Sequence, residues 1–152
     1  YSLQSIPQLN TAAGTNFTNM FYGCSSLQSI PQLNTAAGTN FTSMFYNCYS
    51  LQSIPQLNTA AGTNFTNTLT SCFSLSSAPL SGIEYSINYS YLKLSRNALI
   101  DIFNNLGTTG SGMSRTIQIG NNYGKDDLTA IDSGIATGKN WIITTWSLFT
   151  KN

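Results

Sequence analysis

Residues 2–18, 26–42 and 50–66 each read SLQSIPQLNTAAGTNFT, without a mismatch. The copies lie 24 residues apart, and a fixed period of about 20 to 50 residues indicates stacked supersecondary units. A fourth, degraded copy follows, with Ala78 in place of the isoleucine of the earlier copies. The tandem array is therefore predicted to end near residue 82, and because the chain opens on a complete copy we expect more repeats upstream.

The middle copy contains two apolar patterns. Leu27 and Ile30, followed by Pro31, predict a strand of about four or five residues that the proline ends. A second set is spaced i, i+3, i+4, i+7, which predicts one apolar face of a short helix. Its members are Phe41, Met44, Phe45 and Cys48.

A strand, a loop, a short helix and a return within 24 residues have the size of a leucine-rich repeat. Stacked copies would pair their strands in a parallel sheet, with the short helical segments opposite. We therefore predict an α/β leucine-rich-repeat solenoid whose tandem repeats occupy residues 1–82. Its exposed ends need caps, because neighbouring units bury what one unit cannot.

The last third of the chain has a different composition, and all six basic and five acidic residues lie within 84–152. The predicted elements are a strand over 83–91, a helix capped by Ser95 and ended by Gly107, a strand over 115–120, a helix that begins at Asp126 and Asp127, and a strand over 141–145. We interpret residues 83–152 as capping units of the same solenoid, in longer strand and helix units, since terminal repeats are expected to be atypical.

The repeat also carries a family resemblance. Met20-Phe21-x-x-Cys24-x-x-Leu27-x-x-Ile30 resembles the M-F-x-x-C-x-x-L-x-x-I/L signature of BspA-like leucine-rich-repeat proteins. The likeness covers about residues 1 to 80, and the third copy departs from it with Thr68 and Leu69 in place of the Met-Phe pair. The family occurs on bacterial surfaces and in phage proteins, so the resemblance implies adhesion or receptor recognition and an extracellular location, on a bacterial cell or a virion.

Charge and hydropathy narrow the classes of partner. Only 7% of residues are charged, against about 25% in typical soluble domains, and the net charge is +1. Nucleic acid is an unsuitable partner because phosphate binding needs clustered Lys and Arg. Membrane insertion is not expected, since no run approaches the ~18 apolar residues of a spanning helix, and the N-terminus lacks a signal-peptide pattern.

Catalytic and metal chemistry have few candidate residues. The chain has no histidine, so neither a Ser-His-Asp nor a Cys-His site can form, and the recurring Cys24, Cys48 and Cys72 are best interpreted as small buried hydrophobic side chains. Asp126 and Asp127 are adjacent and would diverge on a helix, and the glycine-rich stretch 107–112 lacks the lysine of a phosphate-binding loop. We therefore predict a protein that is not an enzyme and needs no cofactor or metal.

Four Asn-x-Ser/Thr sequences recur at the repeat period, and they match the pattern of an N-glycosylation acceptor. We expect them to be unmodified, because their asparagines are suited to capping helices or bonding loop backbone. The asparagines are Asn16, Asn40, Asn64 and Asn88.

Polar positions that recur in register are the candidate ligand-binding residues. Stacking turns positions such as Gln28, Gln32 and Asn34 into ladders of identical side chains, which either satisfy one another along the stack or present a regular surface to a ligand. Tyr, Asn and Ser suit such surfaces because they offer hydrogen bonds at modest entropic cost. The candidate ligand-binding residues are Gln4, Gln8, Gln28, Gln32, Gln52, Gln56, Tyr22, Tyr46 and Tyr49.

The sequence thus favours a non-catalytic module that binds a host or cell-surface glycan or a protein receptor, as in a bacterial surface adhesin or a phage tail fibre. A parent fibre would also provide a route to homo-oligomers. One alternative is a structural spacer, whose polar ladders serve only the stack. A second alternative is ice binding through the regular Thr and Asn array, which the prolines and bulky glutamines make less regular.

Overall fold

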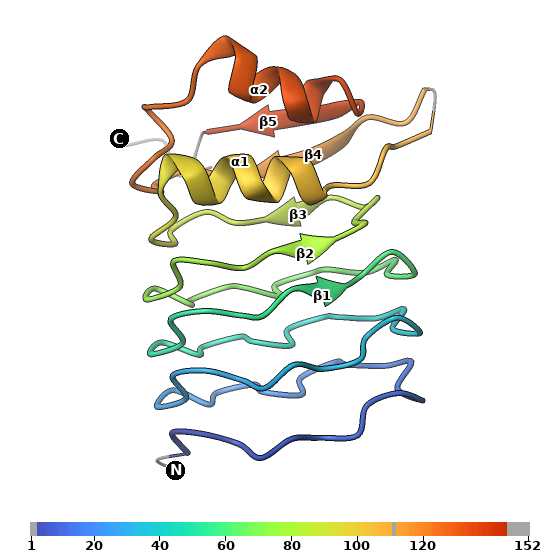
Figure 1. Cartoon of the computed structure of the whole chain (residues 1–152), viewed down its shortest axis with the longest axis vertical. Helices are drawn as coiled ribbons and strands as arrows, with labels where there is room; N and C mark the ends of the chain where they lie inside the picture. The colour runs from blue at the N-terminus through green and yellow to red at the C-terminus, as the bar shows by residue number, and fades with distance from the viewer. Residues whose placement is uncertain (1–2, 111, 146–152) are drawn as a thin grey trace, which may run out of the picture.

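The computed structural model describes residues 3–110 and 112–145 of the chain. The backbone winds through stacked turns from one end of the molecule to the other (Figure 1). We name the three copies repeat 1 (residues 3–25), repeat 2 (26–49) and repeat 3 (50–73). Isolated parallel bridges join each copy to the next at equivalent residues, as between Asn16 and Asn40.

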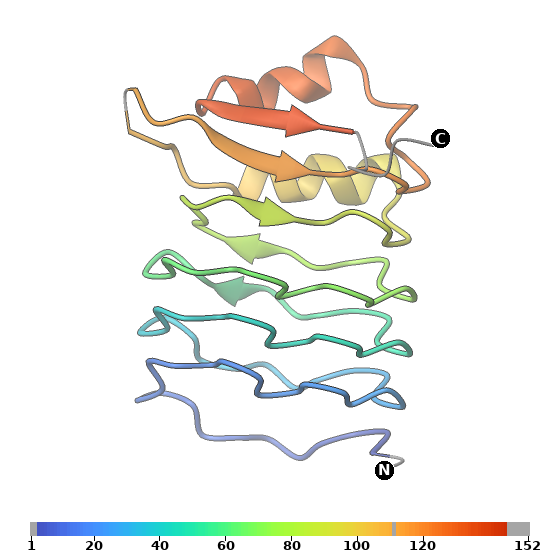
Figure 2. The same ribbon diagram turned by 180° about the vertical axis from the view of Figure 1, so that it is seen from behind.

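The regular elements lie on two opposite faces of the stack. The front face carries β1 and β2, with α1 and α2 above them (Figure 1). The opposite face carries β3, β4 and β5 (Figure 2). We name it the ladder face, because backbone N–H groups such as those of residues 41–47 bond the next repeat there. Both β1-β2 and β3-β4-β5 are parallel sheets. In chain order the elements are β1 (Leu57–Asn58), β2 (Leu80–Ser81), β3 (Ile87–Asn88), α1 (Arg96–Asn105), β4 (Arg115–Gln118), α2 (Ala130–Thr137) and β5 (Trp141–Thr144).

The strand predicted from Leu27 to Ile30 does not form as a regular strand. Neighbouring repeats do share a backbone hydrogen bond there, from the Gln28 N–H to the Gln4 carbonyl at 3.2 Å. Pro31 has no N–H to donate, so the pairing cannot continue through it. Where regular pairing is reached, in β1, it lies after the proline of its repeat.

The short helix predicted over 41–48 is wrong, because this segment forms overlapping turns. Its alternate N–H groups donate to repeat 3 and not to carbonyls four residues back. The donors are Phe41, Ser43, Phe45 and Asn47, and the acceptors are the carbonyls of Asn64, Thr66, Thr68 and Thr70, at 2.9 to 3.0 Å. An α-helix over 41–48 would need the N–H groups of Phe45 and Asn47 for its own ladder, so this stacking and helix formation exclude each other.

The turns of the ladder face require backbone of positive φ at fixed places. Ser43 has a φ of 53° and Asn47 has a φ of 61°. The corresponding residues of the other two repeats are also small or polar, namely Asn19, Gly23, Asn67 and Ser71, with φ between 55° and 70°. Glycine and asparagine reach this region at low energetic cost, so positions that vary between copies still keep residue types suited to a turn.

The core contains columns of identical side chains. The rings of Phe17, Phe41 and Phe65 stack with centroids 5.4 Å and 5.3 Å apart and planes within 6° of parallel. Gly38 lies against this column, and a Cβ there would come within 2.6 Å of Phe41 and 2.8 Å of Phe17. The Ala-Ala-Gly sequence therefore allows the backbone to approach the rings closely.

The C-terminal units follow the sequence predictions more closely. Ser95 caps α1 by accepting from the Ala98 N–H, and the strands predicted over 115–120 and 141–145 correspond to β4 and β5, whereas the one over 83–91 shortens to β3. The prediction that α2 begins at Asp126 and Asp127 is wrong. Thr129 and Asp132 form a capping box, and the paired bonds of that motif fix the helix start at Ala130.

The two helices are joined by charged side chains. The Arg96 guanidinium on α1 donates to both carboxylate oxygens of Asp132 on α2, at 2.8 to 3.0 Å. Lys139 Nζ donates to three carbonyls at the end of α1, those of Phe103, Asn104 and Leu106, at 2.7 to 3.1 Å. These contacts satisfy carbonyls that a helix end leaves without partners and fix α2 onto α1.

Replacing Phe41, the middle ring of the column, tests how far stacking stabilises the repeats. We expect Phe41→Ala to lower the free energy of unfolding by about 3 to 5 kcal/mol, because it leaves a cavity among buried rings. Urea denaturation followed by circular dichroism measures the change. Tyr123→Ala is the control, since Tyr123 is 72% exposed and should change stability by less than about 0.5 kcal/mol. Equal losses in the two variants would contradict the role given to the column.

The contacts of Asp132 predict an acid-sensitive docking of α2. The Thr129 N–H, the Thr129 hydroxyl and Arg96 hold the pKa of Asp132 below its ordinary value of 3.8. A depressed pKa stabilises the folded state above the ordinary value, and the stabilisation is lost as the pH falls through the folded-state pKa. Melting curves at neutral pH and at about pH 2 to 3 should show a smaller acid-induced drop in Tm for Asp132→Asn than for the unmodified chain. Asp127→Asn, which alters an exposed carboxylate without an ion pair in the described residues, should keep the full drop.

Candidate functional site

Three of the candidate glutamines are used by the stack itself. The Gln8 side-chain amide donates to the Gln32 carbonyl at 2.7 Å, and Gln32 repeats this contact with Gln56 at 2.8 Å. The Gln56 amide then donates to Asn105 Oδ1 at the end of α1, at 2.9 Å. This ladder runs from the repeats to α1, so its side chains already have partners.

The remaining candidate residues lie on the surface in separate groups. Gln4, Gln28 and Gln52 are exposed, and their side chains make no hydrogen bond within the described part of the chain. Tyr22 and Tyr46 stack on each other at 5.0 Å, and Tyr49 stacks on Phe73 at 5.8 Å. None of the nine lines the pocket described below.

The cysteines form a column inside the repeats. Cys48 Sγ donates to the Phe21 carbonyl at 3.0 Å and Cys72 Sγ to the Phe45 carbonyl at 3.1 Å. Burial raises the pKa of both thiols to about 12, which leaves them poor nucleophiles at neutral pH. All three cysteines are free, and the described residues include no cluster of three His, Cys, Asp or Glu that could hold a metal ion. Among those residues no helix combines the length and apolar character needed to cross a bilayer.

On the ladder face, the series of backbone hydrogen bonds between successive units stops between repeat 3 and β3. In repeats 1 and 2 alternate N–H groups donate to the next repeat, as Phe17 does to Asn40 and Phe41 does to Asn64. In repeat 3 the equivalent groups have no acceptor among the described residues. They are the N–H groups of Phe65, Asn67, Leu69 and Ser71. The edge of repeat 3 therefore presents unpaired donors toward β3.

The next unit donates onward in the same way, on its side away from repeat 3. Tyr89 takes the sequence position of the stacked phenylalanines, 24 residues after Phe65. Its ring is fully buried, its hydroxyl donates to the Ala78 carbonyl at 3.3 Å, and its N–H donates to Gln118 in β4 at 2.8 Å. β3 thus pairs with β4 on one side and leaves its other edge facing repeat 3.

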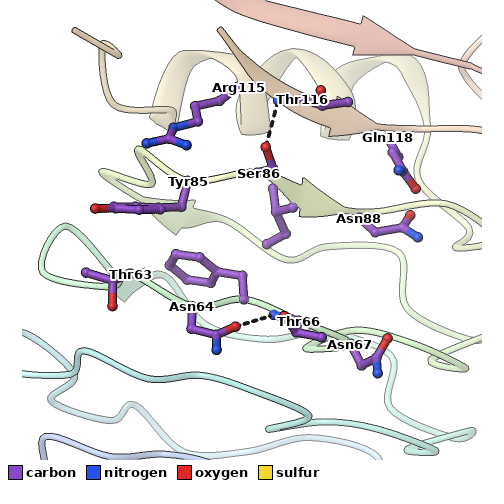
Figure 3. Close-up of a pocket in the computed structure, with 12 residues that line it drawn as sticks. Thr63, Asn64, Thr66, Asn67, Tyr85, Ser86, Asn88, Arg115, Thr116 and Gln118 are labelled. Atoms are coloured by element: carbon purple, nitrogen blue, oxygen red, sulfur yellow. Dashed lines mark hydrogen bonds between the residues drawn. The ribbon is translucent and has the colours of Figure 1, made fainter. Parts of the chain in front are cut away.

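A pocket of about 360 Å³ occupies this break, and we name it the inter-repeat pocket. Figure 3 shows repeat 3 below it, β3 across it and β4 above it. Its lining residues are Thr63, Asn64, Phe65, Thr66, Asn67, Tyr85, Ser86, Ile87, Asn88, Arg115, Thr116 and Gln118. Its volume lies at the low end of the range of about 300 to 1,000 Å³ found for small-molecule sites.

Arg115 and Tyr85 form one end of the inter-repeat pocket. The Arg115 guanidinium carbon lies 4.6 Å from the centre of the Tyr85 ring, a distance typical of a cation–π contact. Among the described residues, Arg115 Nε is buried without a hydrogen-bond partner, and one terminal nitrogen contacts the sulfur of Met113 at 3.6 Å. The lining contains no acidic residue, so the charge of Arg115 is not neutralised within the pocket.

The amides of the inter-repeat pocket have a fixed orientation. Asn64 Oδ1 accepts from the Thr66 N–H at 3.0 Å and Asn88 Oδ1 accepts from the Ser90 N–H at 2.7 Å. The prediction that these asparagines bond loop backbone is confirmed. Since each oxygen is engaged, each side chain has its NH2 group left to donate, and the pocket is rich in donors.

Sequence reasoning missed this pocket because its walls come from segments far apart in the chain. Two features of the sequence did involve the residues around it. The Asn-x-Ser/Thr sequences supply Asn64 and Asn88, and the change in composition near residue 82 marks the unit where the ladder stops. Arg115 carried no sequence signal, since a single arginine at the start of a strand is ordinary.

Comparison with known proteins gives one family. No curated protein and no solved structure matches the chain. The family model described as "Mycoplasma protein of unknown function, DUF285" matches residues 3–82, which are the tandem repeats and the start of the next unit. With more than half of its length matched, the chain belongs to the DUF285 family.

Proposed function

We propose that this protein is a non-catalytic recognition module that acts outside the cell and binds a cell-surface glycan or a protein receptor. It would belong to a bacterial surface adhesin or to a phage tail fibre. Its architecture would be that of a BspA-like leucine-rich-repeat solenoid, with 83–152 as the C-terminal cap. The Met-Phe-x-x-Cys-x-x-Leu motif and the stacked copies support this architecture.

The observation that carries the proposal is the inter-repeat pocket. It is a concave, donor-rich and mainly neutral site at the break in the stack, and ligand sites are typically concave with a few placed polar groups. Its residue types, which are Asn, Thr, Ser and Tyr with one Arg, are also those that recognition surfaces favour. No His, Cys, Asp, Glu or Lys lines it, so its lining has no imidazole, thiol, carboxylate or amine to act as a catalytic base or nucleophile.

A structural spacer is the second candidate function, and the glutamine ladder favours it. Gln8, Gln32 and Gln56 donate along the stack, so the most regular polar feature of the surface already has a structural role. In a spacer the repeats would hold a separate binding domain away from the surface.

A bulky residue placed in the inter-repeat pocket tests the recognition function. Thr66 is exposed and lines the pocket, so we expect Thr66→Trp to fill it and to lower binding at least about tenfold, with an unchanged melting curve. Binding is measured on a glycan array and to whole cells of candidate hosts.

Two variants serve as controls for this assay. Thr42→Trp places the same residue at the equivalent position of repeat 2, which does not line the pocket, and it should bind as the unmodified chain does. The double variant Gln28→Ala, Gln52→Ala removes exposed front-face amides and tests that surface separately. If the folded, unmodified chain binds no glycan and no cell, the spacer function is favoured and the recognition function is wrong for this chain.

A further inference from the structure

We propose that the inter-repeat pocket binds a saccharide that carries a negatively charged group, a carboxylate or a sulfate, placed against Arg115. This inference rests on the proposed recognition function and specifies its ligand class. Three features of the pocket support this ligand class, namely the charge of Arg115, the unpaired backbone donors across the pocket, and the remaining polar lining.

The positive charge of Arg115 has no ion-pair partner among the described residues. The described residues contain ion pairs between Arg96 and Asp132 and between Lys125 and Asp126, but none that includes Arg115. Glu84 and Arg115 both line an adjoining hollow of about 220 Å³, but they form no ion pair with each other. A half-buried guanidinium with a buried, unpartnered Nε is energetically unfavourable unless an acceptor arrives.

The opposite wall adds donors suited to the same kind of ligand. Phe65 and Asn67 line the pocket, and their N–H groups have no acceptor among the described residues. The equivalent groups of repeats 1 and 2 all donate toward the following repeat, so these two are directed toward β3 and the pocket. Backbone N–H groups and a guanidinium on facing walls favour carboxylate or sulfate oxygens, which accept several hydrogen bonds at once.

The rest of the lining fits the neutral part of a sugar. The side-chain NH2 groups of Asn64 and Asn88 donate, while the hydroxyls of Thr66 and Thr116 donate or accept, which matches the hydroxyl groups of a sugar ring. Figure 3 shows the Tyr85 ring between Arg115 and Thr63, so an aromatic surface borders the polar groups. An extended acidic peptide fits less well, because β3 has only two residues to pair with it.

A titration of the 152-residue chain with matched sugars tests the inference. The probes are methyl glucuronide, methyl glucoside 6-sulfate and methyl glucoside, which differ only in the charged or neutral group at one carbon. Binding is followed by amide chemical shifts in NMR spectra. We expect both charged sugars to bind about 10- to 100-fold more tightly than methyl glucoside, with the largest shifts at Phe65, Asn67 and the residues of β3. The ratio between the two charged sugars shows whether the carboxylate or the sulfate is preferred.

Arg115 variants separate a specific contact from net charge. Arg115→Gln should remove the advantage of the charged sugars and leave the weak binding of methyl glucoside unchanged, and Arg115→Lys should restore part of the advantage, since it keeps the charge but loses the planar guanidinium. Lys93→Gln is the matched control. It removes the same charge at an exposed residue outside the pocket and should bind as the unmodified chain does.

The outcomes distinguish this inference from the function on which it rests. Equal affinity for charged and neutral sugars, equal effects of Arg115→Gln and Lys93→Gln, shifts confined to other surfaces, or tighter binding of a tetraglutamate peptide would each overturn the acidic-saccharide inference. Glycan-array binding that Thr66→Trp abolishes but Arg115→Gln leaves intact would do the same while supporting recognition. Absence of binding on the array and to cells would instead overturn the recognition function itself.

Discussion

The hydrogen bonds from the backbone N–H groups of one repeat to the carbonyls of the next are the interaction on which the rest of the structure depends. Each of the alternate donors between Phe41 and Asn47 bonds a carbonyl 23 residues further along the chain. Buried backbone donors need partners, and here the neighbouring copy supplies them, so a repeat satisfies its backbone only within a stack. The columns of phenylalanine, threonine, cysteine and glutamine follow, because a fixed register places identical residues above one another.

This constraint explains which features of the fold could be predicted from the sequence. The stacking of units followed from the period alone, and the start of α1 followed from Ser95, because capping is local chemistry. The prediction of a short helix was wrong because its apolar spacing is compatible with any backbone that turns those side chains inward. The residues concerned are Phe41, Met44, Phe45 and Cys48. The residues that decide between helix and turns are Ser43 and Asn47, whose positive φ depends on hydrogen bonds to another repeat.

The candidate site was less predictable for a related reason. The ladder glutamines were visible in the sequence because they recur, yet recurrence is also what lets Gln8, Gln32 and Gln56 bond one another's repeats. The inter-repeat pocket forms where recurrence fails. It lies where the carbonyls of the β3 unit do not accept the N–H groups of repeat 3, although Tyr89 itself donates onward to Gln118 as the stacked phenylalanines do to the next repeat. No local pattern in the sequence specifies this break.

A change of unit within a stack therefore has two consequences at one place. The last copy keeps donors that its neighbour no longer accepts, which opposes stability since unpaired polar groups are unfavourable when they are shielded from water. The same donors are held in fixed positions by the copies behind them, so ligand binding there carries little entropic cost for ordering them. Regular stacking leaves few such positions along the repeats. The junction between repeat 3 and the unit that contains β3 is therefore a better place for a stack of this kind to acquire specificity than the uniform ladders are.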